Sequence, residues 1–254
     1  MFDPVVLRTK TSYLQRAADL VRLGYRWHVS GVVPLERCAV MVRKFRDVYL
    51  THLGKDARYR RKRVGLGNAH LLLWRSDSHQ YQICWTLLCT EGDHAAHRLE
   101  PNLRNAYDRK CRLVITDYEL VLHDRAAPRA GGGHMVPAKT ARLALSWRMT
   151  KEREIAYRNE FRDLIRGGRV CDLARHWSSL HRVPGFALLR RQVFEIRAFA
   201  RSEWKRHKAG KFPIPGSRIP YVSRVGHWGL PLSAVIRMAN RQQRLEQSSV
   251  PCDE

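Results

Sequence analysis

A surplus of positive charge constrains this chain more than any other feature of its sequence. The 254 residues include 47 Lys and Arg against 23 Asp and Glu, a formal net charge of +24. Like charges in such excess repel one another in a compact state, so the cations must lie at the surface and a polyanionic partner is expected.

Arginine supplies 37 of the cations and lysine only 10. A GC-rich genome explains that ratio but not the net charge. Guanidinium groups bind phosphate bidentately and stack on bases, which favours nucleic acid as the partner.

Other classes of protein find little support. No run of 18 apolar residues is present, and MFDPVVLRTK lacks the pattern of a signal peptide, so a soluble cytoplasmic protein with no membrane partner is expected. The six cysteines form no CxxC pair and the twelve histidines no HExxH cluster. A P-loop, a GxGxxG turn and a GxSxG elbow are also missing from the sequence. The sequence therefore predicts neither a metal nor a cofactor.

Apolar periodicity divides the chain into three regions, of which the first, residues 1–149, is predicted to be mixed α/β. A helix that begins after Pro34 is expected to end at Gly54, and the loop over 125–139 is expected to be mobile. The other expected helices cover 11–23 and 97–107, and the expected strands 25–30, 71–74, 81–89, 112–116, 118–123 and 142–149. The order helix, strand, strand, helix, strand is similar to a ferredoxin-like (RRM-like) sheet with its helices on one side. The predicted fold class is therefore α+β, a ferredoxin-like sheet with an arginine-rich helical insertion.

The second region, residues 150–209, is predicted to be a basic helical finger. Two rows of cations recur at helical spacing. The first consists of Arg158, Arg162, Arg166 and Arg169, and the second of Arg190, Arg197, Arg201 and Lys208. Members of the second row align within roughly 20° over about 27 Å of helix. A solvated helix face usually mixes charges of both signs, and this row contains no acid. We expect the finger to bind the phosphates of a duplex.

The third region, residues 210–254, combines a glycine- and proline-rich basic loop with a last helix from Pro231. The loop interleaves cations with aromatic rings, namely Arg218, Tyr221, Arg224, His227 and Trp228. This pattern suits stacking on unpaired bases and contact with phosphates. An ordinary surface loop with one buried Trp explains the same residues equally well.

The organisation resembles a known family. An α/β start, an arginine-rich helical insertion and the basic loop PGSRIPYVSRVGHWG are similar to the CRISPR-repeat-processing endoribonucleases of the repeat-associated RNA-binding superfamily, in particular those of the type IV systems. The resemblance implies a prokaryotic protein that binds the hairpin of repeat RNA, cuts precursor crRNA without a metal and stays bound to the product. In that reaction a ribose 2′-OH attacks the adjacent phosphodiester and leaves a 2′,3′-cyclic phosphate and a 5′-OH. Other subunits of a CRISPR ribonucleoprotein are further expected partners.

Four residues are candidates for this reaction. Arg37 lies in the first turns of the helix after Pro34, where the helix N-terminus favours an anion. Together with Arg22 and Arg241 it is predicted to form a cluster that stabilises the phosphorane. Superfamily members often place a histidine near the first helix, and His28 is the candidate here.

Two alternatives remain open. One is a non-catalytic RNA- or DNA-binding subunit that uses the same cations. The other is a plasmid-type replication or mobilisation protein that acts on DNA. Proteins of that second kind that cut DNA usually need a nucleophilic tyrosine near a histidine pair and a metal, and no HxH motif lies beside a tyrosine here.

Overall fold

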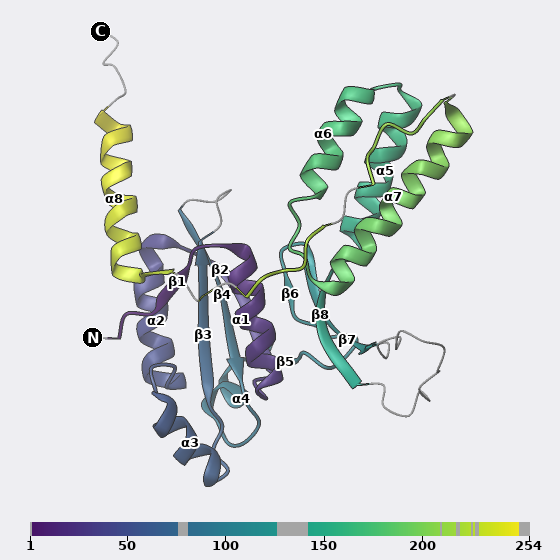
Figure 1. The fold of residues 1–254 in the computed structure, drawn as a ribbon. Coiled ribbons are helices and arrows are strands. Elements are labelled where there is room, and N and C mark those ends of the chain that lie inside the picture. The colour runs from purple at the N-terminus through teal and green to yellow at the C-terminus, as the bar shows by residue number, and fades with distance from the viewer. Residues whose placement is uncertain are drawn as a thin grey trace. The chain divides into compact units, whose positions relative to one another are not determined.

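The structure is a computed structural model that describes residues 2–75, 81–125, 142–208, 210–216, 219–224, 226 and 229–248 (Figure 1). Most of the loop predicted over 125–139 therefore lies outside the described residues, as do Arg218, His227 and Trp228. The chain forms two compact units, residues 1–112 with 224–254 and residues 113–223.

The first unit is built on a six-stranded mixed sheet. Its strand order is β5-β2-β4-β3-β1-β9, in which β1 pairs with β3 in parallel and every other neighbouring pair is antiparallel. The predicted strands over 25–30, 71–74 and 81–89 are present as β2, β3 and β4. The bounds are β1 (Val5–Leu7), β2 (Trp27–Pro34), β3 (Ala69–Arg75), β4 (Gln82–Cys89), β5 (Arg104–Asn105) and β9 (Gly229–Pro231).

Helices cover both faces of this sheet. On one face lies α1 (Lys10–Arg22), whose Tyr13 hydroxyl is 2.6 Å from the Thr86 hydroxyl on β4. On the other lie α2 (Leu35–Tyr49) and α8 (Leu232–Ser248), which share a core with strand residues of opposite parity such as Ile83. Successive residues of a strand point to opposite faces, so the sheet separates α1 from α2 and α8 (Figure 1).

The α+β class is confirmed, but the expected one-sided, ferredoxin-like arrangement is not what this sheet adopts. Strands β1, β2 and β3 run in the same direction, because β2 and β3 are both antiparallel to β4 between them. The connection through α1 runs from β1 past β3 and β4 to β2. The connection through α2 runs in the opposite direction along the sheet, from β2 past β4 to β3. Crossovers of one hand that travel in opposite directions place their helices on opposite faces.

The chain between α2 and β3 also differs from the prediction. Helix α2 ends at Tyr49, where Leu50 takes a left-handed conformation with φ 54°, and does not continue to Gly54. Gly54 instead lies at the N-cap of a further helix, α3 (Lys55–Arg63), which was not predicted. Of the short helix expected near 97–107, only the part up to Leu99 is helical, as α4 (Ala95–Leu99), and Arg104–Asn105 form strand β5 instead.

The second unit joins a three-stranded antiparallel sheet to three helices. Its strand order is β6-β7-β8, and the predicted strands and helices of this stretch are present. The Gln192 side chain on α7 accepts a hydrogen bond from the Met149 amide at the end of β8 (2.7 Å) and donates one to Glu154 on α5 (2.8 Å). The bounds are β6 (Val114–Ile115), β7 (Tyr118–Arg125), β8 (Arg142–Met149), α5 (Lys151–Arg166), α6 (Val170–Leu180) and α7 (Ala187–His207).

These contacts place the unit boundaries differently from the predicted ones. Strands β6 to β8 pack with the helices that follow them, so the boundary lies at 112/113 and not at 149/150. Residues 210–223 also belong to the second unit, whereas α8 completes the first. Among the described helices, none is long and apolar enough to cross a membrane.

Candidate nucleic-acid interface

After α7 the chain turns back and runs along the same helix. Residues 210–216 and 219–222, named here the return segment, are fixed to α7 by side chains of that helix. Arg197 donates from Nε to the Pro215 carbonyl (3.1 Å) and from Nη2 to the Ile214 carbonyl (3.2 Å). The Trp204 indole donates to the Gly210 carbonyl at 3.3 Å.

The far end of the return segment is held in the same manner. The Arg190 guanidinium donates from Nε to the Ile219 carbonyl (2.8 Å) and lies over the Tyr221 ring, 3.5 Å from its centroid. The Val222 amide donates to the Gly185 carbonyl at 3.1 Å. Tyr221 is nonetheless 73% exposed, so the guanidinium orders this ring without burying it.

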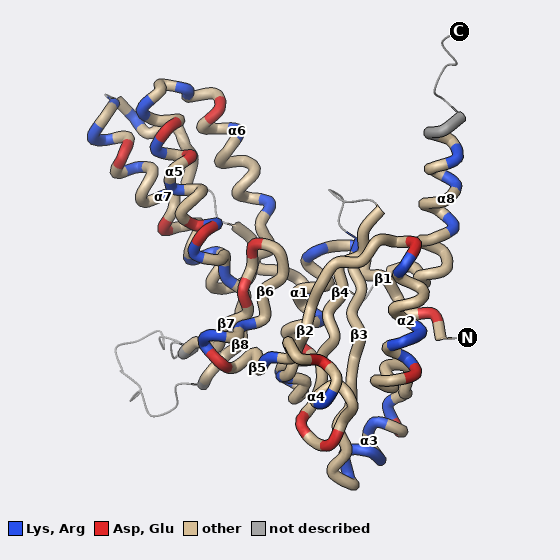
Figure 2. The backbone as a smooth tube through the Cα atoms, turned by 180° about the vertical axis from the view of Figure 1, so that it is seen from behind, with Lys and Arg blue, Asp and Glu red and all other residues tan. Residues whose placement is uncertain are grey.

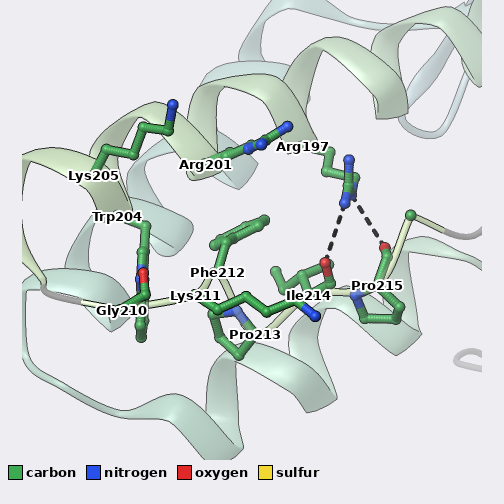
Figure 3. Close-up of a pocket in the computed structure, with 11 residues that line it drawn as sticks. Arg197, Arg201, Trp204, Lys205, Gly210, Lys211, Phe212, Pro213, Ile214 and Pro215 are labelled. Carbon is green, nitrogen blue, oxygen red and sulfur yellow. Dashed lines mark hydrogen bonds between the residues drawn. The ribbon is translucent and has the colours of Figure 1, made fainter.

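A pocket of about 560 Å³ lies between α7 and the first part of the return segment. Figure 3 shows Arg201 and Lys205 along α7, with Lys211 and Phe212 on the return segment. The Phe212 ring meets the Trp204 ring edge-on, with centroids 6.1 Å apart. The pocket therefore combines cations from two segments with an aromatic and proline-containing wall.

Among the described residues, no acid neutralises the charges of this pocket. Arg201, Lys205 and Lys211 make no hydrogen bond or ion pair to any other residue that the structure describes. The two hydrogen bonds of Arg197 go to neutral carbonyl oxygens, which leave its positive charge in place. Such a site suits a ligand that carries both an anionic group and a flat apolar surface.

The predicted row on α7 thus has two roles. Arg190 and Arg197 hold the return segment, which the sequence prediction did not foresee, while Arg201 faces the pocket. Lys208 lies at the C-cap of α7. The row is therefore partly structural, and only part of it is available to a ligand.

The predicted row that begins on α5 lies beside acids of the same unit at two of its four positions. Arg158 pairs with Glu154 at 2.7 Å, and Arg166 lies 3.7 Å from the buried carboxylate of Glu203 on α7. Arg162 bonds Asn159, and Arg169 is the N-cap residue of α6. Two of the four cations therefore lie beside acids, whereas the positions of Arg162 and Arg169 leave their charges in place.

The four residues predicted for catalysis do not come together. Arg22 ends α1 and His28 lies on β2 with its side chain on the α1 face, as its cross-strand partner Leu88 does. Arg37 and Arg241 are exposed residues of α2 and α8, on the other side of the sheet. The prediction of one cluster fails because it placed the first two helices on the same face.

His28 is held in a way that suits packing. It is 6% exposed, and its Nε2 donates to the Cys111 carbonyl at 2.9 Å. Burial lowers the pKa of His28, a shift that the bond to the carbonyl partly opposes and that Arg104 reinforces. Its Nδ1 is buried without a hydrogen-bond partner among the described residues.

One carboxylate on α1 forms ion pairs with two of the predicted cations. Asp19 pairs with Arg22 at 3.0 Å and with Arg224 at 2.7 Å. The Arg224 side chain is 81% exposed, whereas that of Asp19 is 15% exposed. These two guanidiniums therefore share one acid close to the C-terminal end of α1.

Sequence reasoning missed Lys205, Lys211 and Phe212. A signal for Lys205 existed, because it follows Arg201 by four residues and so lies on the same side of the helix. Lys211 and Phe212 gave no such signal, since only the reversal of the chain brings them to α7.

No family model, characterised protein or solved structure matches the chain. Among the described residues, no group of three His, Cys, Asp or Glu side chains could hold a metal ion. The pocket and the distribution of charge are therefore the features of the molecule that bear on its function.

Replacement of Gly185 by Ala should loosen the return segment. An added Cβ would overlap the Pro220 carbonyl oxygen and lie 2.8 Å from the Val222 amide nitrogen, so the backbone must shift. We expect the free energy of unfolding to fall by about 1–3 kcal/mol and trypsin to cleave sooner at Lys211. The control is Gly216→Ala, whose new Cβ would find only the Arg197 guanidinium at 3.5 Å. Equal stability and equal proteolysis of the two variants would show that the segment is not held as described.

Proposed function

We propose that this protein binds RNA and that the pocket between α7 and the return segment holds an unpaired stretch of it. One observation carries the proposal: Arg201, Lys205 and Lys211 surround an aromatic pocket without any acidic partner among the described residues. Phosphates would contact the cations, and a base would contact the Phe212 ring. Stacking on aromatic rings beside a basic groove is the common mode of binding single-stranded nucleic acid.

The exposed ring of Tyr221 supports the same ligand. Arg190 covers one face of this ring, and the residue is 73% exposed. A base stacked on the free face would meet a ring whose orientation is already fixed, so little conformational entropy is lost on binding. Cation and ring together form a second stacking position on the return segment.

A polymeric ligand accounts for the rest of the charge. A small anion would neutralise two or three cations, whereas the chain carries a net charge of +24. RNA offers a long series of phosphates, whose condensed counterions are released on binding. The finer prediction of a ferredoxin-like sheet is not part of this proposal, because α1 and α2 lie on opposite faces. The proposal places the protein in a prokaryotic cytoplasm, as the family resemblance implies.

A second proposal, metal-independent cleavage of the bound RNA, comes from the family resemblance and has one supporting observation. Asp19 holds the Arg22 and Arg224 guanidiniums at one place on α1. A phosphate that displaces this carboxylate would be held by two forked donors, which suits stabilisation of a phosphorane. Arg37 and Arg241, across the sheet, are not part of this arrangement.

Removal of the pocket cations should reduce the dependence of affinity on salt. For the variant Arg201→Gln, Lys205→Gln, Lys211→Gln, the slope of log Kd for single-stranded RNA against log salt concentration should fall by about 2, because each lost phosphate contact contributes about 0.7. The control variant is Arg148→Gln, Arg175→Gln, Arg191→Gln, which removes equal charge from the same unit at cations that pair with acids. Fluorescence anisotropy over a salt series gives both slopes. Equal slopes for the two variants would contradict the pocket.

Truncation of Tyr221 should weaken the binding of unpaired RNA only. Tyr221→Ala removes a stacking surface worth about 1–3 kcal/mol per base, which corresponds to a rise in Kd of roughly 5- to 150-fold. Tyr221→Phe keeps the ring and should bind as the unmodified protein does. A fully paired duplex of the same length should bind both variants alike. If Tyr221→Phe were as weak as Tyr221→Ala, the hydroxyl and not the ring face would be the contact.

The rate of cleavage should depend on Arg22 but not on Arg37 or Arg241. Single-turnover reactions of a repeat hairpin in EDTA should slow by about 10²–10³ in Arg22→Ala, and Arg37→Ala and Arg241→Ala should stay within a few-fold of the unmodified protein. A 2′-deoxy nucleotide before the cut should abolish the reaction in every variant, because the nucleophile belongs to the RNA. Intact hairpin retained by the unmodified protein would instead identify a binding subunit without chemistry. Cutting of the 2′-deoxy substrate, or of DNA, would exclude this reaction class.

A further inference from the structure

Helix α3 is the most basic element of the first unit. Its sequence is KDARYRRKR, and none of its nine residues is buried. Figure 2 shows that Lys and Arg dominate α3, whereas acids and cations alternate along α5 and α7. Four of its cations, Arg60 to Arg63, lie in the last turn. Cations are favourable at this end of a helix dipole, which offsets part of their mutual repulsion.

Two arginines on the inner side of α3 fix the helix in place. Arg58 donates to the Thr51 carbonyl at 2.9 Å, before the helix begins. Arg61 donates from Nε (3.2 Å) and Nη2 (2.9 Å) to the Gly67 carbonyl, after the helix ends. These hydrogen bonds therefore fix the helix to the rest of the unit, although it buries no apolar side chain.

The outer side of α3 presents cations that have no partner among the described residues. Lys55, Lys62 and Arg63 are exposed, and no hydrogen bond or ion pair joins them to another part of the described chain. Their spacings of seven and eight residues place them on one side of the helix, with Tyr59 between them. Tyr59 is 63% exposed. The cations span about 12 Å, the rise of three to four phosphates along one strand of a duplex.

Other partners fit this surface less well. An interfacial helix that binds a membrane needs an apolar face opposite its basic one, and α3 has none. A face that serves only solvation generally mixes charges, and Asp56 is the one acid of this helix. A single convex helix cannot enclose a single strand, but it can lie along the backbone of a duplex.

We propose that α3 is a second RNA contact, which binds the phosphates of a paired stem. The proposal rests on the proposed function for its class of ligand, but it concerns a different unit and a different part of the RNA from the pocket. Lys55, Lys62 and Arg63 contact phosphates, and Arg58 and Arg61 hold the helix in the orientation that presents them.

The test compares two variants of equal charge on the full chain. The variant Lys55→Gln, Lys62→Gln, Arg63→Gln removes the outer cations of α3. The control Arg26→Gln, Arg46→Gln, Arg98→Gln removes three cations of the same unit that pair with acids. Binding of a blunt hairpin RNA is measured by anisotropy over a salt series, with circular dichroism to establish that both variants fold. We expect the slope of log Kd against log salt to fall by about 2–3 in the α3 variant and by less than about 1 in the control.

Each outcome separates the two proposals. Equal slopes in the α3 variant and the control would overturn the role of α3, since only the overall charge would matter. Unchanged hairpin binding, with loss of binding to phosphatidylserine vesicles, would overturn it in favour of a lipid surface. The proposed function itself fails only if the unmodified protein binds neither hairpin nor single-stranded RNA. Loss of hairpin binding in the α3 variant, with single-stranded binding retained, is the result that supports the proposal.

Discussion

The hydrogen bonds from Arg190 and Arg197 to the carbonyls of the return segment determine what the second unit can present to a ligand. Without them, the return segment would have few ties to α7, because the backbone groups along a helix are already bonded within it. A carbonyl acceptor satisfies the donor without cancelling its charge, unlike a carboxylate. Each of these bonds therefore fixes the backbone of the return segment and leaves a positive charge next to it. The pocket, and the orientation of Tyr221, both follow from this arrangement.

The described cations of both units include the same two groups, those paired with carboxylates and those bonded to carbonyls. On α5, and around the buried Glu203, acids neutralise arginines locally. On α3, Arg58 and Arg61 bond carbonyls, and no ion pair joins the outer cations to an acid among the described residues. Exposed ion pairs contribute little to stability, so the neutralised arginines explain little of the fold. Cations without an acidic partner among the described residues lie on α3 and in the pocket, and also on α2 and α8, where Arg37 and Arg241 are exposed.

Much of the secondary structure was predictable, because its signals are local. The alternation over 81–89 and 142–149 indicated β4 and β8, and helical periodicity indicated α5 and α7. The arrangement of strands was not predictable, because β2 pairs with β4 and β1 with β3, which are distant in sequence. Because the helices were predicted to lie on one face, Arg37 and Arg241 were predicted to lie on the same side of the sheet as Arg22. Helix α3 was missed because it buries no apolar residue, and apolar periodicity was the signal used.

The site was predictable only in part. The arginine row on α7 was visible, but the use of Arg190 depends on Ile219, which lies 29 residues away in the chain. A carbonyl leaves no trace in a sequence, since every residue has one. Side chains that bond backbone across such distances cannot be told from free ones before the chain is folded.

Photocrosslinking tests the central claim most directly. A hairpin RNA with a single-stranded flank, substituted with 4-thiouridine, would be irradiated on the protein, and the crosslinked peptides identified by mass spectrometry. The account predicts adducts from the flank on residues 201–216 and 219–224, and adducts from the stem on residues 55–63. Adducts confined to α5, or to the exposed sides of α2 and α8 around Arg37 and Arg241, would contradict it.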